Sequence, residues 1–129
     1  MRDLLAALLE DGWALDDGAS FVADDATHTL DGDKPLIRVY PIASPARPVG
    51  VGYTHRRVEH RLTVDIRSRD LLRAEAAREE ALRILGTRRI APFPGCDLLQ
   101  YDDGSYHGGG PGRSVWTIEV TIMQLRKVI

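Results

Sequence analysis

The chain of 129 residues contains a single cysteine, Cys96. An intramolecular disulfide framework is therefore excluded, and nothing in the composition ties the chain to an oxidising compartment. Aromatic residues make up 6% of the sequence, which leaves little surface on which the bases of a single-stranded nucleic acid could stack. No apolar run approaches the roughly 18 residues that a membrane-spanning helix needs. We therefore expect no membrane partner.

Lysine is also scarce, since the chain has fifteen arginines and two lysines. Its net charge of −2 conceals a segregation of charge along the sequence. Residues 1–35 contain nine acidic and two basic residues, whereas residues 36–91 contain twelve basic and six acidic residues. Charge arranged in this way either steers partners and holds identical subunits head to tail, or marks two solvated faces.

Two consecutive segments have clear periodicity. Residues 58–67 alternate apolar and polar side chains with period two, which is typical of a half-buried antiparallel strand. The segment RDLLRAEAAREEALRIL that follows carries an apolar stripe at helical spacing, three of whose seven residues are alanine. Ser68 is the expected cap of this helix, Asp70 lies in its first turn, and Glu79 and Arg83 form an i,i+4 pair.

The rest of the chain predicts shorter elements. We expect an amphipathic helix over residues 3–10, an irregular segment over 13–34, an edge strand over 36–42, and strands over 96–101 and 114–125. Pro41 implies the edge position of its strand. The last strand is apolar on both faces, so it is central in its sheet or covered by another subunit.

The order of these elements favours an α+β fold in a single two-layer domain spanning residues 1–129. We expect a mostly antiparallel sheet with one long amphipathic helix packed on it, together with the N-terminal helix. Residues 1–35 form the acidic N-terminal helix and irregular segment. Residues 44–57 and 102–113 form two long exposed loops, rich in proline or glycine.

The stretch HGGGPGRS, from His107 to Ser114, resembles the phosphate-binding loop G-x-x-x-x-G-K-[ST]. His107 stands in place of the first glycine, and Arg113 in place of the lysine. A phosphate-binding loop enters a helix whose N-terminal amides face the phosphates, but VWTIEVTI after this stretch predicts a strand. The glycines are thus better explained as a hairpin loop that joins two antiparallel strands.

No constellation of residues predicts catalysis or a cofactor. The histidines are His28, His55, His60 and His107, and no two of them have the spacing of a metal site. His60 lies on the apolar face of its strand, where a hydrogen-bonded core or interface histidine is the simpler explanation. Asp102 and Asp103 fall in a turn, where bonds from side chain to backbone account for them. We therefore predict no enzyme activity, no metal and no cofactor.

A nucleic-acid-binding module is an alternative because arginines run through the segment 44–69. On the polar face of the predicted strand 58–67, however, Glu59 and Asp65 interleave with Arg61 and Arg67. That interleaving weakens any stripe of positive charge that could follow a phosphate backbone.

Three segments together resemble the tail-terminator proteins of long-tailed phages, also called tail-completion or minor tail proteins, which are part of the head–tail connector. The segments are EHRLTVDIRSRD, LLRAEAAREEALRIL and WTIEVTIMQLRKV, preceded by an N-terminal helix and IRVYPIA. The resemblance covers roughly residues 36–126 and rests on the order of elements. The acidic residues 11–35 and the glycine loop depart from it.

The resemblance implies a structural virion protein of the tail or neck, assembled in the host cytoplasm. Its subunits would form a hexameric ring that caps the tail tube protein and joins it to the head-side connector or stopper protein. DNA would pass through the lumen without its sequence being read. Another connector or tail-tube-associated subunit is the alternative in the same class. The candidate contacts to subunit, tube or connector are Arg47, Tyr53, Arg56, Arg57, His107 and Arg113.

Overall fold

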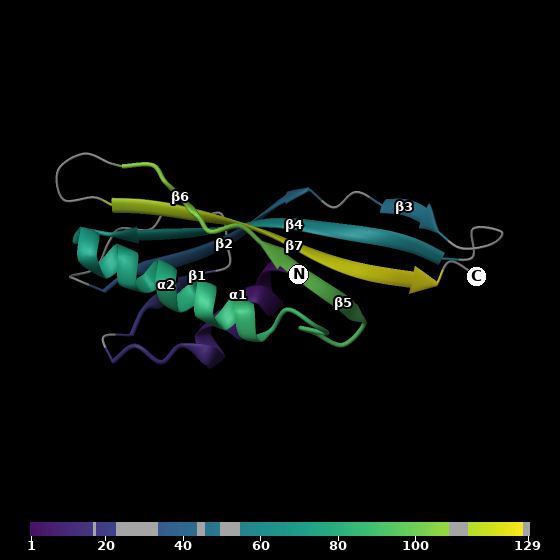
Figure 1. Ribbon diagram of the computed structural model, residues 1–129, viewed down its shortest axis with the longest axis horizontal. Helices are drawn as coiled ribbons and strands as arrows, with labels where there is room; N and C mark the ends of the chain where they lie inside the picture. Colours follow the sequence, from purple (N-terminus) through teal and green to yellow (C-terminus); the bar gives the residue numbers. More distant parts are fainter. Residues whose placement is uncertain (17, 23–33, 44–45, 50–54, 109–113, 128–129) are drawn as a thin grey trace.

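The computed structural model describes the chain except residues 17, 23–33, 44–45, 50–54, 109–113 and 128–129. Within that part of the chain there are two helices and seven strands (Figure 1). In chain order they are α1 (Arg2–Gly12), β1 (Ser20–Val22), β2 (Leu36–Ala43), β3 (Ala46–Val49), β4 (His55–Ser68), α2 (Leu71–Thr87), β5 (Cys96–Tyr101), β6 (Ser105–Tyr106) and β7 (Ser114–Lys127).

All seven strands belong to one sheet, whose main path is β1-β2-β4-β7-β5. The centre is the antiparallel pair of β4 and β7, which are in register from His55 opposite Lys127 to Ser68 opposite Ser114. Strand β3 pairs with the first part of β4, beyond the end of β2, and β6 pairs with the first part of β7, beyond β5. The prediction of a central last strand is confirmed, since β7 lies between β4 and β5.

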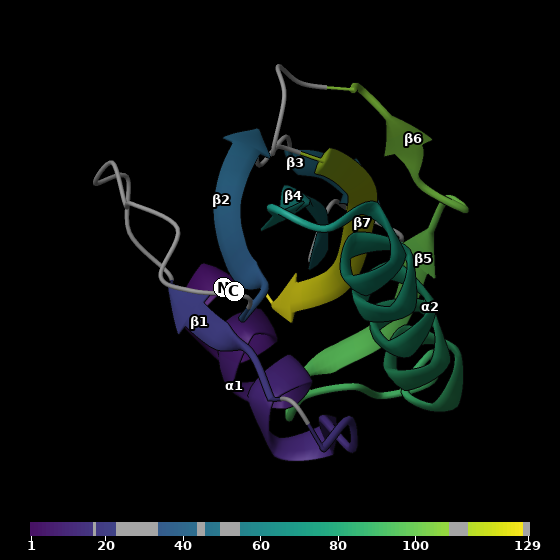
Figure 2. The same cartoon turned by 90° about the vertical axis from the view of Figure 1, so that its left-hand side faces the viewer.

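The α+β class is confirmed, but the expected two-layer arrangement on a mostly antiparallel sheet needs correction. The sheet is mixed, because β1 runs parallel to β2. It also curls into a half-barrel (Figure 2), and both helices pack against its inner face instead of one long helix covering a flat layer. Register shifts between Pro41 and Ala43 and between Cys96 and Leu98 mark bulges, which bend strands and increase their twist.

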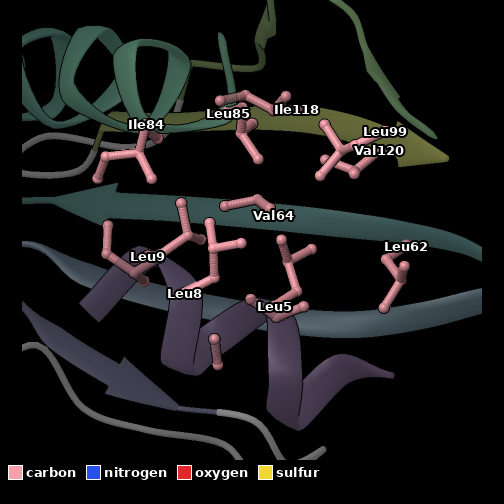
Figure 3. Close-up of a cluster of buried hydrophobic side chains, with 14 of the residues drawn as sticks. Leu5, Leu8, Leu9, Leu62, Val64, Ile84, Leu85, Leu99, Ile118 and Val120 are labelled. Atoms are coloured by element: carbon pink, nitrogen blue, oxygen red, sulfur yellow. The ribbon is translucent and has the colours of Figure 1, made fainter. Parts of the chain in front are cut away.

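The core fills the inner face of the curled sheet (Figure 3). Alternate residues of the central strands face inward, and the register places Val39, Val64 and Ile118 side by side in one row. Leu5 and Leu9 of α1 belong to the same core and are fully buried. Burying a leucine stabilises the fold by roughly 1.5–3 kcal/mol, so these contacts fix α1 against the sheet.

Helix α2 packs beside α1 on the inner face. Its buried side includes Ala74, Ala77 and Ala81, as the small residues of the predicted stripe suggest. Gly12 at the end of α1 allows close approach, because an added Cβ would lie 3.1 Å from Ile84 Cγ2. The prediction of Ser68 as the N-cap is wrong, because α2 begins at Leu71 and the Asp70 carboxylate accepts a hydrogen bond from Leu72 N at 3.0 Å. No helix in the described part of the chain is long and apolar enough to cross a membrane.

Three short strands lie where no strand was predicted. The expected loop 44–57 contains β3 and the first residues of β4, and the expected loop 102–113 contains β6. In the expected irregular segment, β1 forms the parallel edge of the sheet. Each of the three is at most four residues long and is held by pairing with a longer neighbour.

The edge position predicted for the strand with Pro41 is wrong, because β2 lies between β1 and β4. The physical reason is the shortness of β1, which pairs only with residues 36–38. Pro41 lies beyond that pairing, so its lack of a backbone N–H breaks no bond to β1. The turn chemistry predicted for Asp102 is confirmed, since its carboxylate accepts hydrogen bonds from Gly104 N at 3.0 Å and Glu119 N at 3.1 Å.

Candidate interaction surfaces

The outer face of β4 carries alternating charges that pair locally. Arg61 lies 3.5 Å from Glu59, and Arg67 lies 3.1 Å from Asp65. Asp65 is 3% exposed, and both of its carboxylate oxygens accept from Arg67 Nε. The predicted interleaving is thus confirmed, and the middle of β4 offers no continuous row of free positive charge.

The end of the sheet formed by β3, β4 and β7 is different. Its last three register rows consist of residues 47–49, 55–57 and 125–127, which we call the cationic end. The register places Arg47 opposite Arg57, Arg56 opposite Arg126, and His55 opposite Lys127. Five of these nine positions are arginine or lysine, and none is acidic. Like charges directly opposite one another destabilise a sheet.

The pairing of β3 with β4 therefore brings three sequence-predicted residues together, namely Arg47, Arg56 and Arg57. The side chain of Arg57 is exposed, and its guanidinium contacts the sulfur of Met123. Two other predicted contact residues, Tyr53 and Arg113, lie outside the described residues.

His107 is distant from this group along the chain and lies just after β6. Its backbone N–H donates to Val115 O at 2.9 Å, and its ring Nε2 lies 2.6 Å from Thr117 Oγ1. The backbone hydrogen bond continues the antiparallel pairing of β6 with β7, and the ring contact adds a side-chain link to β7. The prediction that the glycine stretch joins two antiparallel strands is confirmed on both sides, because β6 precedes it and β7 begins at Ser114.

A shallow groove of about 680 Å³ runs along the outward side of α2 and is bounded by the segment after α1. We call it the α2 groove. Its lining residues are Leu15, Leu72, Glu75, Ala76, Glu79, Glu80 and Arg83. Leu72 is 73% exposed and Leu15 is 37% exposed, so these two leucines of the α2 groove offer apolar surface to a partner. The carboxylates of Glu75 and Glu79 lie beside that apolar surface.

Glu80 holds one wall of the α2 groove in place. This side chain is buried, yet it accepts a hydrogen bond of 2.9 Å from Ala14 N and another from Arg83. Burial raises the pKa of Glu80, but the Arg83 guanidinium and the N–H groups of Ala14 and Leu15 more than offset this, so its pKa lies below the ordinary value. Glu80 is ionised at neutral pH and ties the segment after α1 to α2.

The predicted pair of Glu79 with Arg83 is wrong. Arg83 instead pairs with Glu80 at i,i+3 and donates to Gly12 O at 2.8 Å. The exposed Glu79 lies 3.4 Å from Arg78. Arg83 turns toward Glu80 because it then satisfies a buried carboxylate and a helix-end carbonyl together.

Among the described residues, acidic side chains of α1 lie beside basic side chains of the segment 36–91. Arg83 bonds to the end of α1, and Glu10 and Asp11 line a second groove of about 530 Å³ together with Arg88. The end of α1 thus lies beside the basic residues Arg83 and Arg88 within one subunit. Within the described residues, the cationic end and the α2 groove differ in charge and are separated in space.

His60 and Cys96 both belong to strands of the sheet. His60 Nε2 lies 2.9 Å from Gln124 Oε1 on the inner face, as expected for a hydrogen-bonded histidine. Cys96 is buried at the start of β5. Within the described residues, no three histidine, cysteine, aspartate or glutamate side chains gather where they could hold a metal ion.

Sequence reasoning missed several contributors to these surfaces, and the buried Glu80 of the α2 groove is one of them. Arg126 and Lys127 join the cationic end only through the register of β7 on β4. Leu72 lies outside the apolar stripe of α2, and this position in the sequence already indicates that its side chain is exposed. A leucine on the polar side of an amphipathic helix is therefore the signal that marks the α2 groove.

Comparison of the sequence with protein-family models and with curated proteins finds no match to either.

Proposed function

We propose that this chain is the subunit of a ring that terminates a phage tail tube and joins it to the head-side connector. The proposal is supported by where the three resembling segments lie in the structure. The three segments that resemble tail terminators correspond to β4, α2 and β7, and α2 packs against both strands of the central pair. The resemblance thus rests on the elements that organise this fold.

The two ends of the subunit carry different surfaces, as the subunit of a ring requires. A ring needs heterologous contacts, in which one surface of a subunit meets a different surface of the next. This chain has a cationic end on one side and an apolar groove with carboxylates on another. In such a ring, Arg57 and His107 are exposed and available to a tube, a connector or a neighbouring subunit.

The experiment is deletion of the gene from the phage or prophage that carries it, with complementation from a plasmid. Without the chain, electron microscopy should show tail tubes of irregular excess length and heads without tails. The wild-type chain should restore tubes of uniform length joined to heads. Normal tails in the deletion strain would contradict the proposal.

A nucleic-acid-binding module is the second candidate, and the cationic end is the observation that favours it. Binding through phosphate contacts would weaken steeply as salt rises. Titration of duplex DNA at several salt concentrations separates this candidate from a ring subunit that associates with itself and leaves DNA unbound.

A further inference from the structure

The cationic end and the α2 groove lie toward opposite ends of the molecule. Figure 1 shows β3 and the end of β7 at the right, whereas α2 begins at the left of the same view. A subunit with complementary surfaces at its two ends can bind a second copy head to tail without blocking either surface.

The charges of the two surfaces are complementary. The cationic end has five arginine or lysine positions, and its register sets two arginine pairs directly opposite each other. In the α2 groove, Arg83 pairs with Glu80, and Arg78 lies 3.4 Å from the 74% exposed Glu79. The lining holds three carboxylates, those of Glu75, Glu79 and Glu80, against the single guanidinium of Arg83. Asp16, next to Leu15, is also exposed. Carboxylates brought against the cationic end would complement the excess of positive charge that the register gathers there.

From these placements we infer that the cationic end of one subunit docks in the α2 groove of the next copy of this chain. The contact buries Leu72 and Leu15 and sets Glu75 and Glu79 against the arginines of the incoming β3–β4–β7 end. This inference rests on the proposed function, because it names the two surfaces through which the ring closes.

A second protein subunit fits the observations better than a nucleic acid. The α2 groove offers apolar and acidic groups, which suit a cationic strand end and repel phosphate. The cationic end is also short, because the charged residues further inward on β4 form two pairs of opposite charge, Glu59 with Arg61 and Asp65 with Arg67. A duplex would need positive charge over a longer track.

The test uses two charge-reversed full-length variants. The tip variant is Arg56→Glu with Arg57→Glu, and the groove variant is Glu75→Arg with Glu79→Arg. Each is examined alone by sedimentation velocity at low and high salt. The wild type should associate, more tightly at low salt, and each variant alone should associate on the order of tenfold more weakly or not at all.

An equimolar mixture of the two variants is the decisive sample. In an alternating assembly every acidic tip meets a basic groove and every basic tip meets an acidic groove, so association should return to the wild-type level. Recovery also shows that both variants are folded. The matched control is Glu10→Arg with Asp11→Arg, which makes the same change of charge outside the α2 groove and should leave association unchanged.

Four results would overturn the inference. They are a wild type that stays monomeric at both salt concentrations, single variants that associate like the wild type, a mixture that fails to recover, and a tip variant that loses duplex binding while its self-association persists. The last result would assign the cationic end to nucleic acid. None of these decides the proposed function, which the deletion and complementation experiment judges separately through tail length.

Discussion

The backbone N–H of Ala14 donates a hydrogen bond of 2.9 Å to the carboxylate of Glu80, 66 residues further along the chain. The same carboxylate accepts from Arg83, which also donates to Gly12 O. One buried anion therefore connects the end of α1, the segment that follows it and the middle of α2. The wall of the α2 groove depends on this connection.

Glu80→Gln should destabilise the fold by about 2 kcal/mol, because a neutral amide weakens both charge-assisted hydrogen bonds at a buried position. Urea unfolding followed by circular dichroism measures the loss. The matched control is Glu79→Gln, one residue away and 74% exposed, which should change the free energy of unfolding by less than about 0.5 kcal/mol. Equal effects of the two substitutions would contradict the role assigned to Glu80.

The stabilisation by Glu80 should also depend on pH in a definite direction. Its pKa in the folded chain lies below the ordinary value of 4.5, so the unfolded state binds more protons as the pH falls. The contribution is complete above the unfolded pKa and is lost as the pH falls through the lower, folded pKa. The difference in unfolding free energy between wild type and Glu80→Gln should therefore shrink below pH 4.5. A difference that grows on acidification would contradict the assignment.

Gly104→Ala should lower the free energy of unfolding by about 1–2 kcal/mol through backbone strain alone, because Gly104 has φ +91°. Packing adds to this cost, since the new Cβ would lie 3.2 Å from Arg78 Cδ and 3.4 Å from Ile118 Cγ1. Gly95→Ala is the control for strain without crowding, with φ +81° and its nearest atom, Gln124 Nε2, at 3.8 Å. Thermal unfolding should show the larger decrease in Tm for Gly104→Ala, and the reverse order would disprove the packing argument.

The longest elements were predictable because each carries its own periodicity. Residues 58–67 and 114–125 alternate clearly enough to define β4 and β7, and the apolar stripe defines α2. The short strands β1, β3 and β6 were not predictable in this way, because each is stabilised by a neighbour distant in sequence. The curl of the sheet was not predictable from the sequence for a related reason. Bulges such as the one after Pro41 arise from pairing between strands and not from a local pattern.

The candidate surfaces were predictable only in part. Arg56 and Arg57 stand together in the sequence, but Arg126 joins them only because β4 and β7 remain in register to their ends. Glu80 was missed because a carboxylate beside an apolar stripe normally indicates the solvated side of a helix. Its burial depends on Ala14, a partner that no helical periodicity can indicate.

Arg78→Met should loosen the connection between β5 and β6. The Arg78 guanidinium lies 4.4 Å from the centre of the Trp116 ring and donates to Asp103 O at 3.0 Å, so one side chain joins α2 to the turn at residues 102–104 and to β7. Methionine keeps an unbranched apolar stem over the ring but removes the charge and the donors, which should lower the free energy of unfolding by about 1–2 kcal/mol.

Amide hydrogen exchange in Arg78→Met should become faster at Gly104 and Glu119, whose N–H groups bond to Asp102. Arg88→Met, at the exposed C-cap of α2, is the matched control and should leave these exchange rates unchanged. Unchanged exchange in Arg78→Met would show that Asp102 alone holds the turn.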